Sequence, residues 1–354
     1  MFHVIFTLDY EIHGNGQGSP RDLMIRPTWD LLNQFNKYGA KLTILADVAE
    51  ILKFREYYEQ HGQDDYHYGE IVRQLKHAVV TGHDVQLHFH SSYAEAEYTH
   101  NHWKQNWEEF DLASLPYSRI HDLINMGKKF LEEVLVPVKA DYACYVFRAV
   151  NWSMQPSKNI VRALIENGLT IDTSVFKYGR RTGRVNFDYT HAPSDVVPWR
   201  VSELDICQRD PHGKLHEVPI YTERRPIIAF LSLNRLYRVL QTRSHRRRPN
   251  AMDGNGEARS GSKLATLADL LLQKHAWKAD FNQCGGYQLI NALKRAEQTY
   301  QDAKVDFPFV LIGHSKSFTR LNELSLGSFL RFVASHPERF AFGTFANIDV
   351  TNFN

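Results

Sequence analysis

The sequence predicts an α/β fold in which parallel strands are joined by crossover helices. Short apolar runs, typical of buried strands, alternate along the chain with segments whose apolar residues have helical spacing. A second observation favours the same fold, because the polar residues best suited to chemistry directly follow the predicted strands. In α/β barrels and open α/β sheets, ligands bind at the carboxyl ends of the strands. The residues concerned are Asp9, His88, His90, Arg148, Asp172 and His314.

Each element is predicted from apolar spacing and from the glycines that end helices. Strands are expected at residues 1–8, 41–46, 82–90, 142–147, 169–171 and 307–312. Helices are expected at residues 27–38, 68–81, 119–134, 157–167, 286–303 and 326–335. Gly39, Gly82 and Gly168 each stand where a helix should stop before the next strand begins.

Length and composition are those of a globular protein. With 354 residues, of which 43% are hydrophobic and 23% charged, the chain can bury a large core, and we expect a single domain over residues 1–354. The formal net charge of +2 gives no electrostatic reason to expect a nucleic-acid partner. Nothing in the sequence indicates the oligomeric state.

Residues 242–262 differ from the rest of the chain. They begin with basic residues, including the run 246–248, and continue with glycine, asparagine and proline but almost no large apolar side chain. Such a segment cannot bury enough apolar surface to pack. We expect a flexible insertion, either a solvated loop or an active-site lid, whose arginines could meet a phosphate on a nucleotide-linked or lipid-linked substrate.

The cysteines and the apolar runs indicate the compartment. Cys144, Cys207 and Cys284 are odd in number, far apart and without C-x-x-C spacing, so neither a disulfide framework nor a thiolate zinc site is expected. No leader-like segment precedes the first strand, and no apolar stretch approaches the ~20 residues of a membrane span. We therefore expect a cytoplasmic protein without an integral membrane segment.

Two pairs of polar residues suggest a metal centre. His88 and His90 lie two apart in a strand-like run, so their side chains point to one face with Cα atoms ~6.5–7 Å apart. Asp9 and Glu11 form a similar pair at the end of the first strand. Two imidazoles and one carboxylate leave coordination positions open for water, as in catalytic metal sites. The alternative is a pair of buried, hydrogen-bonded histidines or of surface residues on an exposed strand.

Several motifs together resemble the polysaccharide deacetylase superfamily, the NodB-like carbohydrate esterases. They occur in the family's order between residues 5 and 315, and they are 6–11 (FTLDYE), 82–90 (GHDVQLHFH), 147–149 (FRA), 172–175 (DTSV) and 311–314 (LIGH). The resemblance implies a distorted (β/α) barrel of about seven parallel strands. It also implies a divalent metal, zinc in preference to cobalt or manganese, and the hydrolytic removal of an N-acetyl or N-formyl group from an amino sugar. The carbohydrate would be a polysaccharide, a lipopolysaccharide or a nucleotide-linked or lipid-linked precursor.

The chain departs from the family pattern at both metal motifs. The family's first motif has two adjacent aspartates, whereas this chain has Asp9 and Glu11 separated by a tyrosine. The family's two ligand histidines lie four apart, whereas His90 follows His88 by two, with Ser92 at the family's position. These differences indicate a divergent branch that shares the mechanism but not the substrate.

By this resemblance His88 and His90 bind the metal, Glu11 is the third ligand, and Asp9 is the general base that takes a proton from the attacking water. The division of roles between Asp9 and Glu11 stays open. Asp9 could instead cap a helix or form a turn. Glu11 could instead lie on the surface.

Three further residues complete the expected site. His314 would protonate the departing amine, Arg148 would keep the carboxylate of Asp9 ionised, and Asp172 would orient His314. Each has an ordinary alternative, which is a turn histidine for His314, a strand-end ion pair for Arg148 and turn chemistry for Asp172. His83 is expected to be structural.

The aromatic-rich segment 93–107 follows the histidine strand and could form a wall on which sugar rings stack, as could Trp152. Packing on the barrel rim is the alternative. Two other functions remain open for the whole chain, a barrel that binds glycans without hydrolysing them and a non-haem iron oxygenase. The latter chemistry usually occupies an all-β scaffold, which the alternation of strands and helices disfavours.

Overall fold

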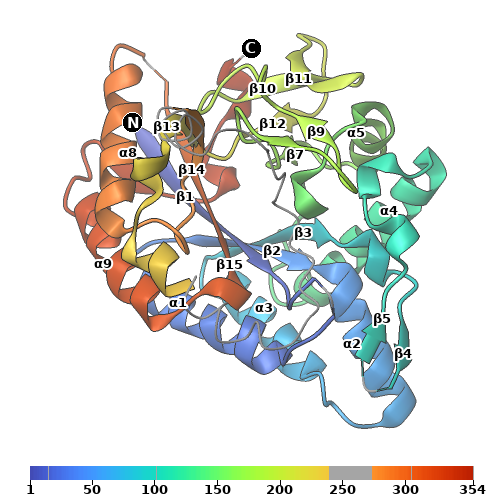
Figure 1. Cartoon of the computed structure of the whole chain (residues 1–354). Helices are drawn as coiled ribbons and strands as arrows, with labels where there is room; N and C mark the ends of the chain where they lie inside the picture. The colour runs from blue at the N-terminus through green and yellow to red at the C-terminus, as the bar shows by residue number, and fades with distance from the viewer. Residues whose placement is uncertain (15, 101, 239–272, 304, 354) are drawn as a thin grey trace, which may run out of the picture.

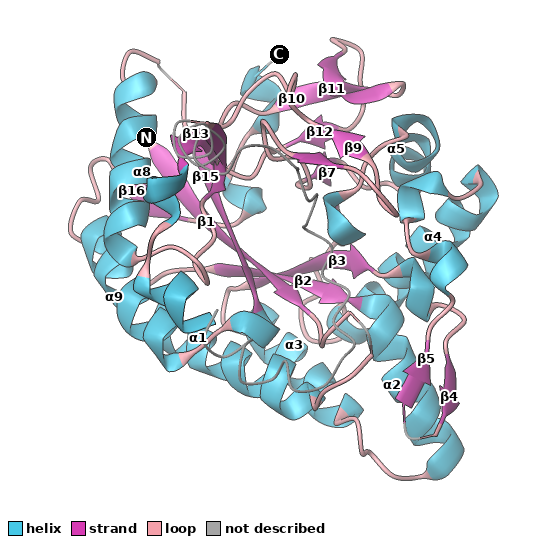
Figure 2. Ribbon diagram, in the orientation of Figure 1, coloured by secondary structure: helices cyan, strands magenta, loops and turns pink. Residues whose placement is uncertain are grey.

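The computed structural model describes residues 1–14, 16–100, 102–238, 273–303 and 305–353 (Figure 1). The predicted insertion at 242–262 lies outside the described residues. The remaining elements form an α/β fold whose helices surround a strongly curled sheet (Figure 2).

The main sheet has ten strands in the order β11-β10-β12-β7-β6-β3-β2-β1-β15, with β16 (Phe340–Phe342) also pairing with β1. From β12 to β15 along this order, every neighbouring pair runs parallel. These parallel strands are β1 (Phe2–Tyr10), β2 (Leu42–Asp47), β3 (Asp84–Phe89), β6 (Val146–Ala149), β7 (Ile171–Asp172), β12 (His216–Glu217) and β15 (Phe307–His314). The antiparallel strands β10 (Trp199–Ser202) and β11 (Asp205–Arg209) extend the sheet beyond β12.

The curled sheet closes through single contacts between its ends. After β12 the chain reaches β15, where Ile220 bridges to Val310 and the amide of Tyr221 donates to the carbonyl of Val310 at 3.0 Å. Asp280 forms a second isolated bridge to Ile312. The result is a distorted barrel of seven parallel strands, as the sequence motifs predict.

The predicted helices are present, with most bounds differing by a few residues, but α9 begins six residues before the predicted start at 326. They are α1 (Arg26–Asn36), α3 (Tyr68–Val80), α4 (Tyr117–Leu135), α5 (Ser157–Glu166), α8 (Gly286–Thr299) and α9 (Arg320–Ala334). Helix α2 (Val48–His61) was not predicted. It begins directly after β2 with no glycine or proline between them, so the sequence offers no break that would mark its start.

Smaller elements connect this framework. Three two-stranded sheets are β4 (Glu97–Thr99) with β5 (His102–Lys104), β8 (Arg180–Arg181) with β9 (Phe187–Asp188), and β13 (Thr222–Pro226) with β14 (Lys274–Lys278). A π-helical turn, η1 (Arg21–Ile25), precedes α1. Short 3-10 turns are η2 (Ser91–Tyr93), η3 (Trp107–Glu109), η4 (Leu112–Ser114), η5 (Val150–Trp152), η6 (Ile227–Phe230), η7 (Ser315–Ser317), η8 (Phe345–Asn347) and η9 (Val350–Phe353).

Strand β6 begins later than predicted, at Val146 instead of residue 142. The side chain of Gln86 explains the difference. Its Oε1 accepts the backbone N–H groups of Tyr145 and Val146, both at 2.9 Å. A side chain therefore replaces the strand ladder at this point and satisfies the backbone donors.

Alternation along β1 separates the core from the site. Phe6 packs outward against Phe35 of α1 and Phe329 of α9, with ring centroids 4.6 and 5.9 Å away. Thr7 and Asp9, on the other face of the strand, both accept hydrogen bonds from a buried arginine inside the barrel. The interior is therefore polar at the carboxyl end of β1 and apolar on the helix-covered side. Across the parts of the chain that the structure describes, no helix is both long enough and apolar enough to cross a membrane.

Candidate metal centre

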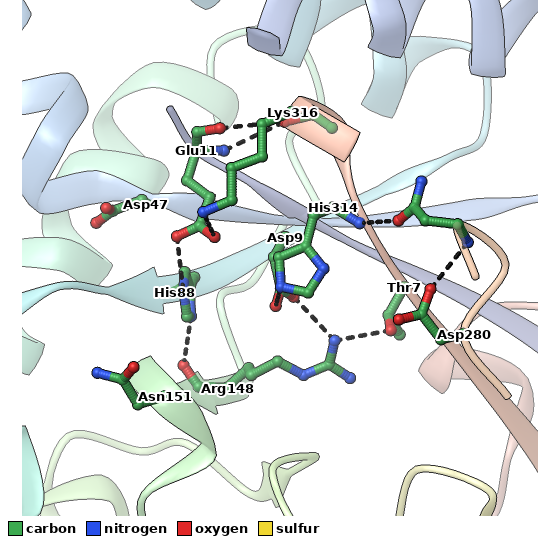
Figure 3. Close-up of polar contacts among 12 residues, drawn as sticks. Thr7, Asp9, Glu11, Asp47, His88, Arg148, Asn151, Asp280, His314 and Lys316 are labelled. Atoms are coloured by element: carbon green, nitrogen blue, oxygen red, sulfur yellow. Dashed lines mark hydrogen bonds and ion pairs between the residues drawn. The ribbon is translucent and has the colours of Figure 1, made fainter. Parts of the chain in front are cut away.

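Glu11, His88 and His90 bring three potential ligand atoms together at the carboxyl ends of β1 and β3. Figure 3 shows the carboxylate of Glu11 facing His88. Glu11 Oε2 lies 2.7 Å from His90 Nε2 and 3.6 Å from His88 Nε2, and the two Nε2 atoms are 3.1 Å apart. Ligands of a tetrahedral zinc ion at ~2.0–2.1 Å are about 3.3 Å from one another. The spacing in the structure therefore suits a small divalent cation.

A backbone hydrogen bond orients His88 for this role. Its Nδ1 lies 2.8 Å from the carbonyl oxygen of Arg148 on the neighbouring strand β6. Because a carbonyl only accepts, Nδ1 carries a proton, so the lone pair that deprotonation would expose is on Nε2, which faces Glu11. A partner on the second nitrogen that fixes the tautomer is the usual arrangement for metal-binding histidines.

Asp47 plays the corresponding part for His90. This aspartate ends β2, is fully buried, and accepts the backbone N–H of His90 at 3.0 Å through Oδ1. Its Oδ2 lies 3.9 Å from His90 Nδ1 and has no hydrogen-bond partner among the described residues. Asp47 thus holds both the backbone and the ring of His90 beside the cluster.

Lys316 fixes the carboxylate of Glu11. Its Nζ donates to Glu11 Oε1 at 2.7 Å and to the carbonyl of Ile12 at 3.2 Å. Burial would raise the pKa of Glu11, but Lys316 and His90 outweigh it and hold this pKa well below its usual range. Oε2 is buried and faces the Nε2 atoms of His88 and His90. One oxygen is therefore held by Lys316, and the other lies among the potential ligand atoms.

The charge balance of the cluster also suits a cation. Burial alone would lower the pKa of His88, yet Glu11, Asp9 and Asp47 raise it to about 9. The attraction of these carboxylates for a positive charge therefore outweighs the effect of burial at the ring. A divalent ion at this point would offset their negative charge. The residues present thus fit the metal that the resemblance implies.

Asp9 lies beside this cluster and is gripped by Arg148. The guanidinium is completely buried, and its Nη1 donates to Asp9 Oδ1 at 2.9 Å and to Thr7 Oγ1 at 2.8 Å (Figure 3). Burial would raise the pKa of Asp9, but Arg148 and His314 overcome it and the pKa falls below its ordinary value. The carboxylate is therefore ionised at neutral pH.

His314 contacts Asp9 from the neighbouring strand β15. Its Nε2 is 3.4 Å from Asp9 Oδ2, and its backbone N–H donates to Asn282 Oδ1 at 2.6 Å. Burial lowers the pKa of His314, while Asp9 and Glu11 act in the opposite direction. Asp9 and His314 thus form an acid–base pair between which a proton can move.

The structure pairs His314 with Asp9 and not with Asp172, which corrects one expectation. Asp172 is buried at the end of β7, where its carboxylate accepts the hydroxyl of Ser174 at 2.7 Å and the amide of Ser174 at 3.2 Å. Glu217 of β12 lies beside it, and burial raises the pKa of both carboxyl groups. Asp172 therefore belongs to a buried carboxyl pair that holds neighbouring backbone together.

The aromatic segment that follows β3 packs mostly away from the metal ligands. Tyr98 makes edge contacts with Tyr57 of α2 and with Tyr66, and Trp103 lies tilted against Tyr66 and Tyr98, at centroid distances of 4.8–5.9 Å. These side chains pack against one another at the edge of the barrel, which is the alternative to a sugar-stacking wall. Trp152 differs, because its ring lies 5.9 Å from that of His314.

Sequence analysis missed Asp47 and Lys316, although a signal for both was present. Asp47 immediately follows a predicted strand, and Lys316 follows His314 by two positions. The rule that singled out the other strand-end residues applies to both. Asn282, in contrast, belongs to no predicted element, and nothing in its surrounding sequence indicates that it holds His314.

Comparisons with known proteins agree with this fold. No protein-family model matches the sequence, and no curated protein sequence matches it. A Mycobacterium smegmatis protein classed with the polysaccharide deacetylases has a similar structure, with a TM-score of 0.51 and 13% identity over 99% of this chain and 89% of that one.

Two carbohydrate-active enzymes show a comparable likeness. A 4-α-glucanotransferase from Thermococcus litoralis gives a TM-score of 0.52 at 14% identity, covering 98% of this chain and 40% of that chain. A branching enzyme from Thermococcus kodakaraensis gives 0.50 at 10% identity, covering 98% of this chain and 70% of that chain. At such identities the likeness concerns the fold. The chain therefore has the NodB-like distorted barrel of the polysaccharide deacetylases, with a possible Glu-His-His metal site at the carboxyl ends of its strands.

Proposed function

We propose that this protein is a metal-dependent hydrolase that removes an N-acetyl or N-formyl group from an amino sugar. The observation that carries the proposal is the convergence of Glu11 Oε2, His88 Nε2 and His90 Nε2. The Asp9–Arg148 pair lies beside this convergence, within the same end of the barrel. The substrate would be part of a polysaccharide, a lipopolysaccharide or a nucleotide-linked or lipid-linked precursor.

Glu11, His88 and His90 would hold the cation, and zinc suits two nitrogen ligands and one carboxylate oxygen. When bound, the ion would polarise the amide carbonyl and activate a water molecule for attack. Asp9 would take the proton from that water, because Arg148 binds its carboxylate and keeps it ionised beside the ligand cluster.

His314 would deliver a proton to the departing sugar nitrogen. Its Nε2 lies 3.4 Å from Asp9 Oδ2, so the proton collected by Asp9 can pass to the imidazole. Because burial lowers the pKa of His314, the protonated ring gives up its proton readily. Asn282 would keep the ring in place by holding its backbone.

Two other functions make different demands on the molecule. A non-haem iron oxygenase also uses two histidines and one carboxylate. The parallel barrel is not the all-β scaffold on which that chemistry is usual. A glycan-binding barrel without activity would need none of the ionised Asp9, the neutral His314 or the cluster of metal-ligand atoms.

The test is release of acetate or formate from a panel of N-acylated amino sugars, free, nucleotide-linked and lipid-linked. Chelator treatment should abolish release, and zinc, cobalt or manganese should restore it. His88→Ala should prevent restoration, whereas His102→Ala, which removes an exposed histidine, should not. Release that survives His88→Ala and His90→Ala together would refute the ligand assignment. Glycan affinity indifferent to both chelator and Asp9→Asn would instead support the binding barrel.

We further propose that the reaction takes place in the cytoplasm, during synthesis of a surface carbohydrate. The three cysteines, Cys144, Cys207 and Cys284, are buried free thiols, as is usual for proteins of a reducing compartment, and they support this setting. Fractionation of cells that produce the native chain would test it, since recovery with secreted or periplasmic proteins would exclude a cytoplasmic location.

A further inference from the structure

Lys278 carries a positive charge that no described residue pairs. It ends β14, and its Nζ lies 3.6 Å from the ring centroid of Trp152 and 4.2 Å from that of Phe176. No described residue accepts a hydrogen bond from this ammonium group or forms an ion pair with it. The two rings offer the charge a favourable quadrupole but no acceptor for its three N–H groups.

The fold brings this lysine to the candidate metal centre. Just after Lys278, the amide of Ala279 donates to the carbonyl of Tyr221, and the carbonyl of Ala279 accepts from Ile312, both at 3.0 Å. The segment is thereby held between Tyr221, which immediately precedes β13, and strand β15. Trp152 completes the connection, because its ring contacts Lys278 on one side and lies 5.9 Å from that of His314.

The nearby carboxylates are already occupied. Asp280, shown in Figure 3, accepts the backbone N–H groups of Asn282 and Gln283 at 2.8 and 3.1 Å. Asp9 is bound by Arg148. Burial lowers the pKa of Lys278 to about 8, so most of the side chain is still charged at neutral pH. Lys278 is half-buried, and a cation partly withdrawn from water without a hydrogen-bond acceptor is costly unless a ligand supplies one.

The residues beneath the ammonium group of Lys278 show two further features of a ligand-binding site. Trp152 Nε1 is buried and has no hydrogen-bond partner among the described residues. Asn151 and Trp152 are consecutive residues with left-handed backbone angles, φ 55° and 58°. Such conformations are costly for residues other than glycine and cluster where a protein binds ligands.

We propose that Lys278, seated on Trp152, recognises an oxyanion on the substrate, a carboxylate or a phosphate carried by the sugar whose acyl group is removed. This inference rests on the proposed hydrolase function and narrows its substrate class to negatively charged amino sugars. A sugar whose amide lies at Glu11, His88 and His90 and whose nitrogen faces His314 would bring its substituents to Trp152, since the two rings are 5.9 Å apart. A charge-assisted hydrogen bond there should tighten binding about tenfold or more.

Three probes separate charge from shape and the two sources of charge from each other. They are N-acetylglucosamine, which is neutral, N-acetylmuramic acid, which adds a carboxylate, and N-acetylglucosamine 6-phosphate. Titration calorimetry on the full chain loaded with zinc would give the three dissociation constants, with acetate release followed in parallel. We expect at least one charged probe to bind about tenfold tighter than the neutral one. The preferred charged probe then identifies the carboxylate or the phosphate.

Variants assign the preference to this lysine. Lys278→Met, and Lys278→Gln as a second neutral variant, should lose the preference for the charged probe. Lys294→Met is the matched control, because Lys294 also lies over an aromatic ring, 5.1 Å from that of Phe332, and belongs to α8. It should keep the preference.

Three outcomes would overturn the inference. They are equal binding of all three probes, no binding of either charged probe, and a preference for the charged probe that survives in both Lys278 variants. The parallel assay keeps it distinct from the proposed function. A charge preference without acetate release contradicts the hydrolase and leaves the oxyanion site standing. Acetate release without a charge preference supports the hydrolase and contradicts the oxyanion site.

Discussion

Arg148 connects four parts of the barrel through one buried side chain. Its guanidinium donates to Asp9 and Thr7 of β1 and to the carbonyl and hydroxyl oxygens of Thr173 beyond β7, while its own carbonyl accepts from His88. A buried charge that loses its partner is strongly destabilising, because the partner then remains uncompensated in a medium of low polarity. Arg148 therefore serves both the fold and the ionisation of Asp9.

We predict that Arg148→Met lowers the free energy of unfolding by about 3–5 kcal/mol. It should also move the acid limb of the pH profile of kcat/KM to higher pH. The direction of the shift follows from Asp9, because Arg148 lowers the pKa of this carboxyl group. Removing Arg148 raises that pKa, and with it the pH at which the general base becomes ionised. Urea denaturation and a pH series would measure the two effects. Adding Asp9→Asn to Arg148→Met should cost less than the sum of the single losses, and strict additivity would show that the two side chains do not interact.

At the scale of elements, helix α4 lies unusually close to the strand that carries the histidines. A Cβ atom added at Gly127 of α4 would lie 2.7 Å from Leu87 Cδ1 and 3.0 Å from Phe89 Cδ2. Both neighbours are fully buried in β3 and flank His88. The close approach thus requires glycine here, even though glycine is a poor helix former.

Gly127→Ala should therefore destabilise the protein by about 1–3 kcal/mol, because overpacking outweighs a gain of about 1 kcal/mol in helix propensity. Gly327→Ala in α9 is the matched control. Its added Cβ would meet only Gln34 Nε2, at 3.4 Å, so propensity should prevail and stability should rise slightly. Urea denaturation of both variants would decide, and a stabilised Gly127→Ala would show that α4 can move away from β3.

His83 holds the start of β3 beside β2, in the structural role expected from the sequence. Its Nδ1 accepts the backbone N–H of Leu42 at 3.1 Å, and its Nε2 faces Asn36 Oδ1 at 3.2 Å. The neutral ring satisfies both contacts, whereas a protonated ring would present a hydrogen on Nδ1 to another N–H. Burial, with smaller effects of Lys41 and His77, lowers the pKa of His83 from 6.5 to about 4.

Because the pKa is lower in the folded state, this histidine contributes stability that is fully present above pH 6.5 and is lost as the pH falls toward 4. The loss should reach roughly 2–3 kcal/mol. His83→Gln removes the titrating group, so the stability difference between wild type and variant should narrow over that window. Urea denaturation between pH 7 and pH 4 would measure it. A constant difference would show that His83 does not titrate there.

At the scale of the whole molecule, sequence patterns predict local structure and strand-end chemistry but not contacts between distant segments. The i, i+2 spacing of His88 with His90 places both side chains in the cluster, since alternation along a strand is a local property. The pairing of His314 with Asp9 depends on β15 lying next to β1 in register, with Asp9 opposite His314. The same register is invisible in the sequence, and so Asp172 was assigned as the partner of His314.

Lys278 shows the limit most clearly. It reaches Trp152 only because the two-stranded β13–β14 sheet directs the following segment between Tyr221 and Ile312. The sequence of β14, which includes Lys278, contains no motif that would indicate a binding site. Helix α2 was missed for a different reason, the lack of a break after β2. The sequence thus failed to predict contacts between residues that are distant along the chain and helix starts that no glycine or proline marks.

The last prediction concerns the coupling of metal binding to the stability of the barrel. Glu11 follows β1 and the two histidines come from the end of β3, so the three ligand atoms converge only when the strands are assembled. A cation that binds the folded chain alone must then stabilise it. At about 100 times its dissociation constant, zinc should add about 2.7 kcal/mol to the free energy of unfolding, and chelation should remove this gain.

Urea denaturation with zinc and with chelator would measure this coupling without any assumption about substrate. His88→Ala combined with His90→Ala should abolish the difference between the two conditions, whereas the exposed-site variant His102→Ala should retain it. Stabilisation by zinc that persists in the double variant would place the ion elsewhere in the molecule. Its absence in the wild type would mean that the three atoms, though correctly spaced, hold no metal, and the hydrolase proposal would lose the observation on which it rests.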